Sequence, residues 1–281
     1  MPRIAVGLEY HGGAYAGWQA QAGLRTVQSV LEEALARIAA QPIALVCAGR
    51  TDAGVHAVGQ VAHFDAEVHR SARGWTLGTN TELPADVSVS WAAEVAPPFH
   101  ARHSAVSRTY CYLIHNRGAR SALAAGRAAM IYQPLAVERM RDGAAALVGE
   151  HDFSAFRAAE CQSRTPVRRV HALTVEREGD WVLIRITANA FLHHMVRNIA
   201  GLLIAVGRGK APPAWAREVL ESRDRTRGAA TAPADGLYLW RVRYPPAFPL
   251  PADPPRSAWA MIPGLGAFRS LTDPDDEYVL V

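Results

Sequence analysis

The chain has 281 residues, of which 49% are hydrophobic and 20% charged, and its formal net charge is +4. This composition is typical of a globular protein with one large core or two modest ones, and it excludes a disordered or fibrous chain. The longest apolar runs, such as residues 199–206, are too short to span a bilayer, so we expect no membrane segment.

The three cysteines, Cys47, Cys111 and Cys161, are odd in number and far apart in the sequence. Their spacing fits neither a disulfide framework nor a metal site, and two of them lie in apolar strand patterns. No signal-peptide pattern precedes the first strand-like residues. We therefore expect reduced core thiols, no bound metal and a cytoplasmic protein.

The cationic residues are almost all arginines, since Lys210 is the only lysine. No acidic residue lies between Glu94 and Glu138, a stretch that contains five arginines: Arg102, Arg108, Arg117, Arg120 and Arg127. A guanidinium group binds phosphate through two hydrogen bonds and stacks on bases, so the pattern favours a nucleic-acid partner. A general compositional bias toward arginine would produce the same excess.

Two successive parts of the chain show the same order of predicted elements. In the first part, apolar residues at helical spacing predict a helix over 27–38, which Thr26 would cap, and a short helix over 71–79. Strand patterns occur at residues 3–9, 43–48, 58–64 and 87–95. The resulting order, β-α-β-β-α-β, is that of the ferredoxin-like unit.

The second part repeats this order. Helical patterns occur over 137–148 and 192–206, and a hairpin turns at Gly179-Asp180. Strand patterns occur at residues 107–114, 170–176, 181–187 and 237–243. Two such units predict an α+β fold whose mainly antiparallel sheet carries helices on one face and an open central cleft on the other. RNA-recognition domains share this unit, but a fold alone does not establish a function.

Proline and small residues mark the expected domain boundaries. We expect an N-terminal unit over residues 1–103 and a C-terminal unit over 104–244, divided near Pro97-Pro98. From residue 245 the chain is rich in proline, and we expect 245–281 to be an extended tail on the surface. Removing the residues after Met261 is then expected to leave activity largely intact.

A loop with glycines on both sides, GRTDAGVH at residues 49–56, separates two predicted strands. Glycines permit a tight loop and the close approach of a ligand backbone. Beside an arginine, Asp52 would keep a low pKa and remain an anionic nucleophile. An aspartate in such a loop also commonly caps a turn, and these residues alone do not decide between the two roles.

This loop resembles the catalytic loop of the TruA family of pseudouridine synthases. Other segments also resemble that family, in its order and with compatible spacing: residues 10–12, 17–19, 107–112 (SRTYCY), 151–156, 164–168, 191–199 (FLHHMVRNI) and 236–239 (GLYL). The resemblance runs from about residue 4 to about residue 244 and does not extend to 262–281. It implies the pseudouridine-synthase fold.

The resemblance implies an isomerase that converts uridine to pseudouridine at positions 38, 39 and 40 of the tRNA anticodon arm, without cofactor or metal. Asp52 would be the essential catalytic carboxylate, which either attacks C1′ of the ribose or removes the 2′ proton. Members of the family usually work as homodimers in which one tRNA touches both subunits. We therefore expect a homodimer that binds the anticodon stem-loop.

The resemblance also implies substrate-binding roles for Arg50, Tyr110, Arg197 and Leu237. Arg50 would hold a phosphate of the flipped nucleotide or fill the vacated stack. Tyr110 would stack on the uracil and is a candidate for removing the C5 proton. Arg197 would pair with Asp52, and Leu237 would pack against the target base. Without the motifs, Tyr110 and Leu237 would be interpreted as core residues and Arg197 as a solvated charge.

Two other interpretations remain open. A non-catalytic protein of two RNA-recognition units is disfavoured because the strands lack the aromatic pattern of such units. A hydrolase or nuclease that uses Asp52 is disfavoured because no second carboxylate lies nearby in the sequence.

Two other motifs are rejected. Residues 207–210 (GRGK) do not form a phosphate loop, since Ile204 and Ala211 stand where glycine and Ser or Thr are needed. His193-His194 are adjacent, so they cannot both face one metal from a helix.

Overall fold

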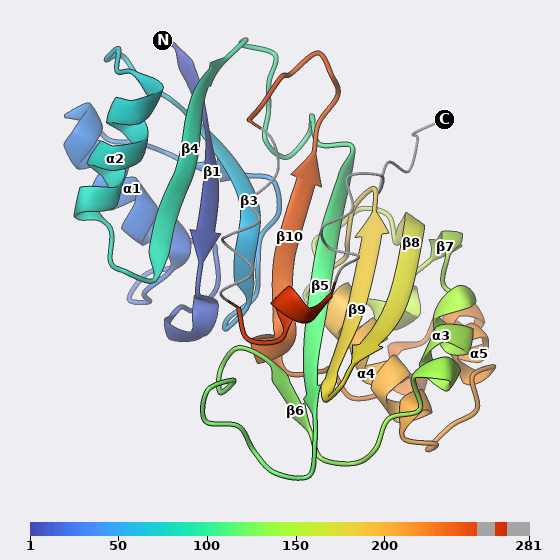
Figure 1. Ribbon diagram of the computed structural model, residues 1–281. Helices are drawn as coiled ribbons and strands as arrows, with labels where there is room; N and C mark the ends of the chain where they lie inside the picture. The colour runs from blue at the N-terminus through green and yellow to red at the C-terminus, as the bar shows by residue number, and fades with distance from the viewer. Residues whose placement is uncertain (252–261, 269–281) are drawn as a thin grey trace. The chain divides into compact units, whose positions relative to one another are not determined.

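The computed structural model describes residues 1–251 and 262–268 (Figure 1). It divides into two compact units: unit 1 comprises Met1–Arg108 and Tyr238–Pro254, and unit 2 comprises Thr109–Leu237 and Pro255–Val281. In both units helices accompany a mostly antiparallel sheet, which confirms the α+β class. None of the helices in these described ranges is long and apolar enough to traverse a bilayer.

The sheet of unit 1 contains strands from both ends of the chain: β1 (Arg3–Tyr10), β2 (Val46–Cys47), β3 (His56–Asp65), β4 (Val87–Val95) and β10 (Leu237–Arg243). β1 pairs antiparallel with β3 and with β4, and β2 pairs antiparallel with β3. β10 runs parallel to β3, with Tyr238 opposite His56. Because of this pairing, residues 238–243 belong to unit 1, whereas the sequence pattern placed them at the end of the second unit.

Both helices of unit 1, α1 (Val27–Ala39) and α2 (Ala72–Glu82), begin at a side-chain cap. The Ser29 N–H donates to Thr26 Oγ1 at 3.2 Å and the Thr26 N–H donates to Ser29 Oγ at 3.3 Å, a reciprocal capping box. Trp75 of α2 meets Phe64 of β3 edge to face, with ring centroids 5.1 Å apart. The helices therefore cover the sheet face that carries Phe64.

Unit 2 contains a long hairpin, β8 (Val167–Glu178) and β9 (Trp181–Ala188), which turns at Gly179 as predicted. Its other strands are β5 (Ser107–Asn116), β6 (Ala129–Ile131) and β7 (Gly149–Asp152). The helices are α3 (Val137–Ala145), α4 (Met195–Gly207) and α5 (Trp215–Ser222). The sequence pattern predicted α3, α4 and the hairpin, but not β6, β7 or α5.

The C-terminal segment differs from the extended surface tail expected over 245–281. Phe248 and Leu250 pack against a buried cluster of unit 1 formed by Ala5, Ala48, Val61, Phe99 and Ala101. Within unit 2, a 3₁₀ turn at Leu265–Ala267 buries Leu265 and Phe268, which are 0% and 1% exposed. Apolar side chains in both described parts of this segment therefore add to the cores, while the remainder lies outside the described residues.

Candidate active site

The loop between β2 and β3 presents Arg50 and Asp52 on either side of a buried residue. Arg50 is exposed and Asp52 partly exposed, whereas Thr51 is only 6% exposed. The Thr51 hydroxyl lies 2.8 Å from the Tyr10 hydroxyl, and its carbonyl oxygen accepts a hydrogen bond from the Trp18 N–H at 2.9 Å. Thr51 thus anchors the middle of the loop and leaves its two charged neighbours accessible.

Two glycines explain why the loop can pack against the segment that follows β1. A Cβ at Gly17, whose φ is +91°, would lie 2.8 Å from the Thr51 carbonyl oxygen, and a Cβ at Gly12 would overlap the Val55 carbonyl oxygen. Any side chain at these positions would displace the loop, and an L-residue at Gly17 would also be strained. The glycines of the motif segments 10–12 and 17–19 therefore provide the surface on which the Asp52 loop rests.

The end of the loop is fixed by His56, which is 1% exposed. Its Nδ1 accepts a hydrogen bond from the Gly12 N–H at 3.0 Å. Its ring lies between those of His11 and Tyr238, with centroid separations of 4.5 and 4.7 Å. Tyr238 reaches this position because β10 runs beside β3 in unit 1. Tyr238 of the motif at 236–239 thus helps to hold the loop.

Two buried side chains that sequence reasoning did not assign to the site hold the beginning of the loop. Gln60 Nε2 donates to the Gly49 carbonyl oxygen at 2.7 Å, and Arg108 Nη2 donates to the Ala48 carbonyl oxygen at 3.0 Å. Arg108 is 8% exposed and also donates to two other backbone carbonyls. A buried guanidinium needs such acceptors. The place of Arg108 in the SRTYCY motif was the signal that could have identified it.

Tyr110, Arg197 and Leu237, the other residues predicted for the site, belong to unit 2. Tyr110 on β5 is 8% exposed and meets Phe191 edge to face at 4.9 Å. Arg197 on α4 is partly buried, and its Nε donates to the Ala232 carbonyl oxygen at 2.9 Å. Leu237 is 5% exposed at the start of β10. Each of these residues is thus packed or hydrogen-bonded within its own unit.

Cys47, which directly precedes the loop, does not compete with Asp52 as a nucleophile. Burial raises the pKa of the Cys47 thiol to about 12, against the opposing effect of Arg50 and Arg102. The thiol is therefore protonated at neutral pH, and a protonated thiol is a poor nucleophile. All three cysteines are free and buried, which confirms their interpretation as core thiols.

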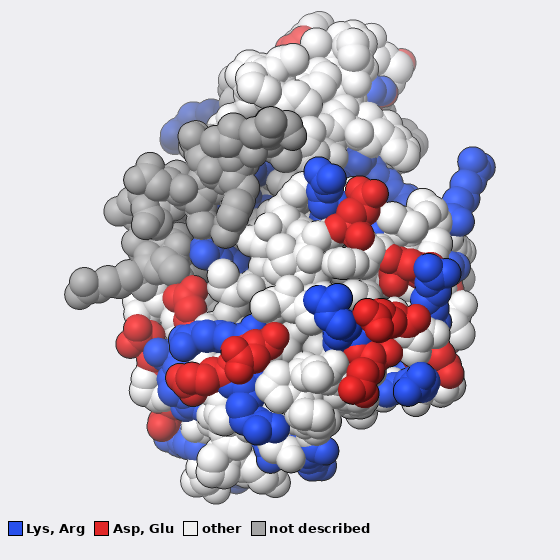
Figure 2. Space-filling model, turned by 90° about the vertical axis from the view of Figure 1, so that its right-hand side faces the viewer, with Lys and Arg blue, Asp and Glu red and all other residues white. Residues whose placement is uncertain are grey.

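The surface of unit 2 that carries α3, α5 and β7 is not a concentrated basic patch. Figure 2 shows cationic and anionic side chains interspersed over this face. Arg141–Glu138, Arg217–Glu221, Arg169–Glu150 and Arg223–Asp152 form ion pairs of 3.4 to 3.8 Å there. Exposed pairs of this kind contribute little to stability, but they balance the positive charge locally.

Comparison with known protein families assigns the class. A family model described as "tRNA pseudouridine synthase" matches residues 8–104 and 144–245. These ranges include the Asp52 loop of unit 1 and the α4 segment of unit 2 that carries Arg197. The match places the chain in the class of tRNA pseudouridine synthases.

Curated relatives give the same result over nearly the whole chain. Proteins named "tRNA pseudouridine synthase A" are 57% identical in Methylococcus capsulatus and 56% in Nitrosococcus oceani, over 98% and 89% of this chain. The matches cover 99% and 96% of those relatives. A solved structure, a Cbf5-Nop10-Gar1 complex, matches over 71% of this chain and 54% of its own with 13% identity and a TM-score of 0.31. The chain belongs to the tRNA pseudouridine synthase A family.

Proposed function

We propose that this chain isomerises uridine to pseudouridine at positions 38, 39 and 40 in the anticodon arm of tRNA, with Asp52 as the catalytic residue. The observation that carries the proposal is the way the loop holds Asp52. Thr51 and His56 are buried and hydrogen-bonded on either side of it, while Asp52 itself is partly exposed. A carboxylate on a rigid but accessible support meets the requirement for a positioned nucleophile or base.

The reaction breaks the N-glycosidic bond, turns the uracil over and joins its C5 to C1′ of the same ribose. In one route the Asp52 carboxylate attacks C1′, forms an ester and releases the uracil anion, which then displaces the carboxylate through C5. In the other route Asp52 removes the 2′ proton as the uracil anion departs, which leaves a glycal; C5 of the uracil then adds to C1′ while Asp52 returns the proton to C2′. In both routes the C5 proton is finally lost and N1 gains a proton, so no external energy or cofactor is consumed.

We assign substrate-binding roles to Arg50, Tyr110, Arg197 and Leu237. Arg50 is exposed two residues before Asp52, so its guanidinium is available to a phosphate of the target nucleotide. Tyr110 has a ring fixed by Phe191, which favours stacking on the uracil and use of its hydroxyl toward the C5 proton. The buried Leu237 suits contact with an apolar base face, and Arg197 supplies a cation for the site.

The partners and compartment are part of the same proposal. We propose that the enzyme acts as a homodimer on the anticodon stem-loop, in the cytoplasm, without metal or cofactor. The three free, buried thiols are consistent with a reducing compartment.

Product analysis tests the proposed function directly. The protein is incubated with a tRNA transcript labelled in uridine, and the digested nucleosides are separated. Pseudouridine at positions 38 to 40 is the expected product. Free uracil would instead indicate a hydrolase, and unchanged uridine would indicate a binding protein; either result contradicts the proposal.

A further inference from the structure

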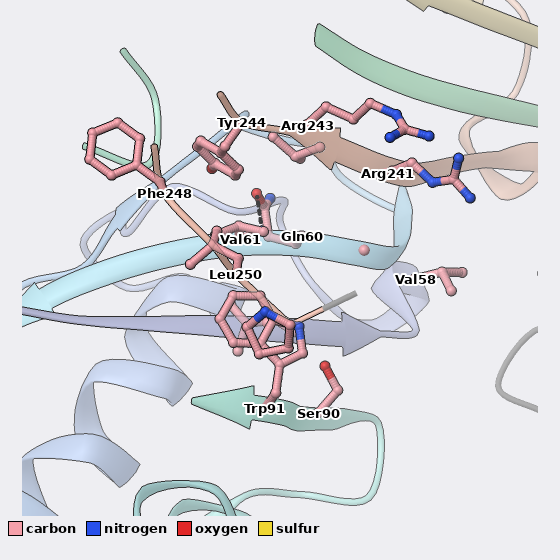
Figure 3. A pocket seen from close by; sticks show the side chains of 15 residues that line it. Val58, Gln60, Val61, Ser90, Trp91, Arg241, Arg243, Tyr244, Phe248 and Leu250 are labelled. Carbon is pink, nitrogen blue, oxygen red and sulfur yellow. Dashed lines mark hydrogen bonds between the residues drawn. The ribbon is translucent and has the colours of Figure 1, made fainter. Parts of the chain in front are cut away.

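A groove lies within unit 1 on the sheet face opposite its two helices (Figure 3). Its volume is about 290 Å³. Strands β1, β3, β4 and β10 contribute to it, together with the segment that follows β10. Its lining includes Gly7, Gly59, Trp91, Arg241, Arg243 and Leu250.

The groove depends on two glycines in its floor. The indole of Trp91 occupies the space that a Cβ at Gly7 would take, so this partly exposed ring rests on the backbone of β1. A Cβ at Gly59 would overlap the carbonyl oxygen of Trp240 on the neighbouring strand. Without side chains at these two positions, the strands pack closely beneath the groove, and the Trp91 ring lies directly on the β1 backbone along one side of the groove.

The other side of the groove is cationic. Figure 3 shows Arg241 and Arg243 extending from β10, on the side away from Trp91. None of the described residues that line the groove is acidic. The Arg243 guanidinium makes no hydrogen bond or ion pair with any residue in the ranges 1–251 and 262–268. Among the described residues, Arg243 therefore has no paired carboxylate, in contrast to the paired arginines on the helical face of unit 2.

We propose that this groove binds one unpaired nucleotide of the tRNA, distinct from the uridine that is isomerised. The inference rests on the proposed function. Trp91 would stack on the base, and Arg241 with Arg243 would bind the adjoining phosphates. Aromatic rings beside a positively charged groove are the common means of binding single-stranded nucleic acid, because every base has a face that can stack. A paired base presents no free face, so the nucleotide belongs to a loop or is displaced from its stem.

Two variants with a matched control test the groove. Trp91→Leu removes the stacking surface, and Arg243→Gln removes one phosphate-binding charge. Arg73→Gln makes the same change of charge on α2, on the helical side of unit 1. We expect Trp91→Leu to weaken tRNA binding by about 5- to 100-fold, as for loss of one stacked base. Arg243→Gln should lower the slope of log Kd against log salt by about one. Arg73→Gln should bind like wild type.

A folding defect in Trp91→Leu would mimic lost binding, so a second measurement separates the two. tRNAs that carry one abasic nucleotide at each loop position in turn are bound to wild type and to Trp91→Leu. The inference requires one abasic position that weakens binding to wild type but has no further effect on the variant. A defect in folding would weaken binding to every tRNA alike and leave all abasic penalties unchanged.

These outcomes are independent of the proposed reaction. If wild type forms no pseudouridine, the proposed function fails. If wild type forms pseudouridine while no abasic position is coupled to Trp91, or while Arg243→Gln binds with an unchanged salt slope, the groove is not a nucleotide site. If the groove binds a protein segment instead, wild type would form pseudouridine, but no abasic position would be coupled to Trp91.

Discussion

The guanidinium of Arg108 donates a hydrogen bond of 3.0 Å to the carbonyl oxygen of Ala48, although 60 residues separate them in the sequence. Ala48 directly precedes the loop that carries Asp52. Arg108 Nη2 also donates to the Arg102 carbonyl oxygen, and Nη1 donates to that of Ala105. One buried side chain therefore links the start of the Asp52 loop to the chain that leads into β5.

We predict that Arg108→Lys lowers both stability and turnover. An ammonium group has three donors on one atom, so it cannot reach carbonyl groups in the directions that the guanidinium serves. Each buried carbonyl left without a donor costs about 1–3 kcal/mol. Thermal melts and single-turnover pseudouridine formation would measure the two effects, with the exposed Arg102→Lys as control. Wild-type values for Arg108→Lys in both assays would contradict the positioning role.

Arg197→Lys should impair the enzyme more than a conservative exchange suggests. The Nε of Arg197 donates to the Ala232 carbonyl oxygen at 2.9 Å, and the terminal nitrogens of a guanidinium can hold a carboxylate or phosphate at the same time. Lysine cannot make both kinds of contact at once. We expect turnover to fall by about tenfold or more, equivalent to one lost charge-assisted hydrogen bond. Arg217→Lys on α5 is the control, and equal turnover in both variants would argue against a role for Arg197.

Leu265→Ala should destabilise unit 2. Leu265 is fully buried, and truncation of a buried leucine costs about 2–5 kcal/mol. Removing all residues after Met261 would also delete Phe268, so this truncation should lower the melting temperature and, with it, activity. The sequence-based expectation was the opposite. Leu123→Ala is a suitable control, because Leu123 is 84% exposed. A truncated protein that melts like the full chain would restore the original expectation.

The elements that the sequence predicted are those with a clear hydrophobic period or a helix-capping residue. The strand predicted at 87–95 matches β4, and Thr26 caps α1 as expected. β6 has three residues and β7 reads GEHD, so neither shows an alternating apolar pattern. The C-terminal segment was misjudged because its few apolar residues have no period, although Leu265 and Phe268 are core residues.

The candidate site was predicted only in part, for a different reason. Motif resemblance pointed to Asp52, and the accessible loop that holds it is consistent with that role. Arg108 was grouped with the arginines that favour a nucleic-acid partner, because a sequence does not reveal which arginines are satisfied by distant carbonyls. Gln60 is 0% exposed, and its side chain on β3 donates a hydrogen bond to the Gly49 carbonyl oxygen, which follows the neighbouring strand β2. Such contacts between distant residues depend on the tertiary fold and have no local signature.

tRNA binding should depend strongly on salt and little on stem sequence. The Asp52 loop and the groove of unit 1 both carry exposed or partly exposed arginines, namely Arg50, Arg241 and Arg243. Each phosphate that a cation neutralises releases counterions, so log Kd should change with log salt with a slope of several units. Filter binding between about 50 and 200 mM salt would measure it. A flat response would contradict binding through phosphates.

The most specific prediction concerns Asp52→Asn. The amide keeps the shape of the carboxylate and most of its hydrogen-bonding capacity, but it carries no charge. It can neither attack C1′ effectively nor remove the 2′ proton, so pseudouridine formation should fall to background by either route. Binding should persist, because tRNA affinity rests on arginines rather than on an anion that repels phosphate. Stability should change little, since Thr51 and His56 anchor the loop through their own contacts.

Tritium release from C5-labelled uridine in tRNA measures turnover, and filter binding with thermal melts is run in parallel. Asp142→Asn, at an exposed carboxylate on α3, controls for the loss of one negative charge. A hydrolase would also lose turnover in Asp52→Asn, so the wild-type product must be identified as pseudouridine in the same experiment. If Asp52→Asn releases tritium at a rate near that of wild type, Asp52 is a residue that shapes the turn, and the catalytic carboxylate lies elsewhere.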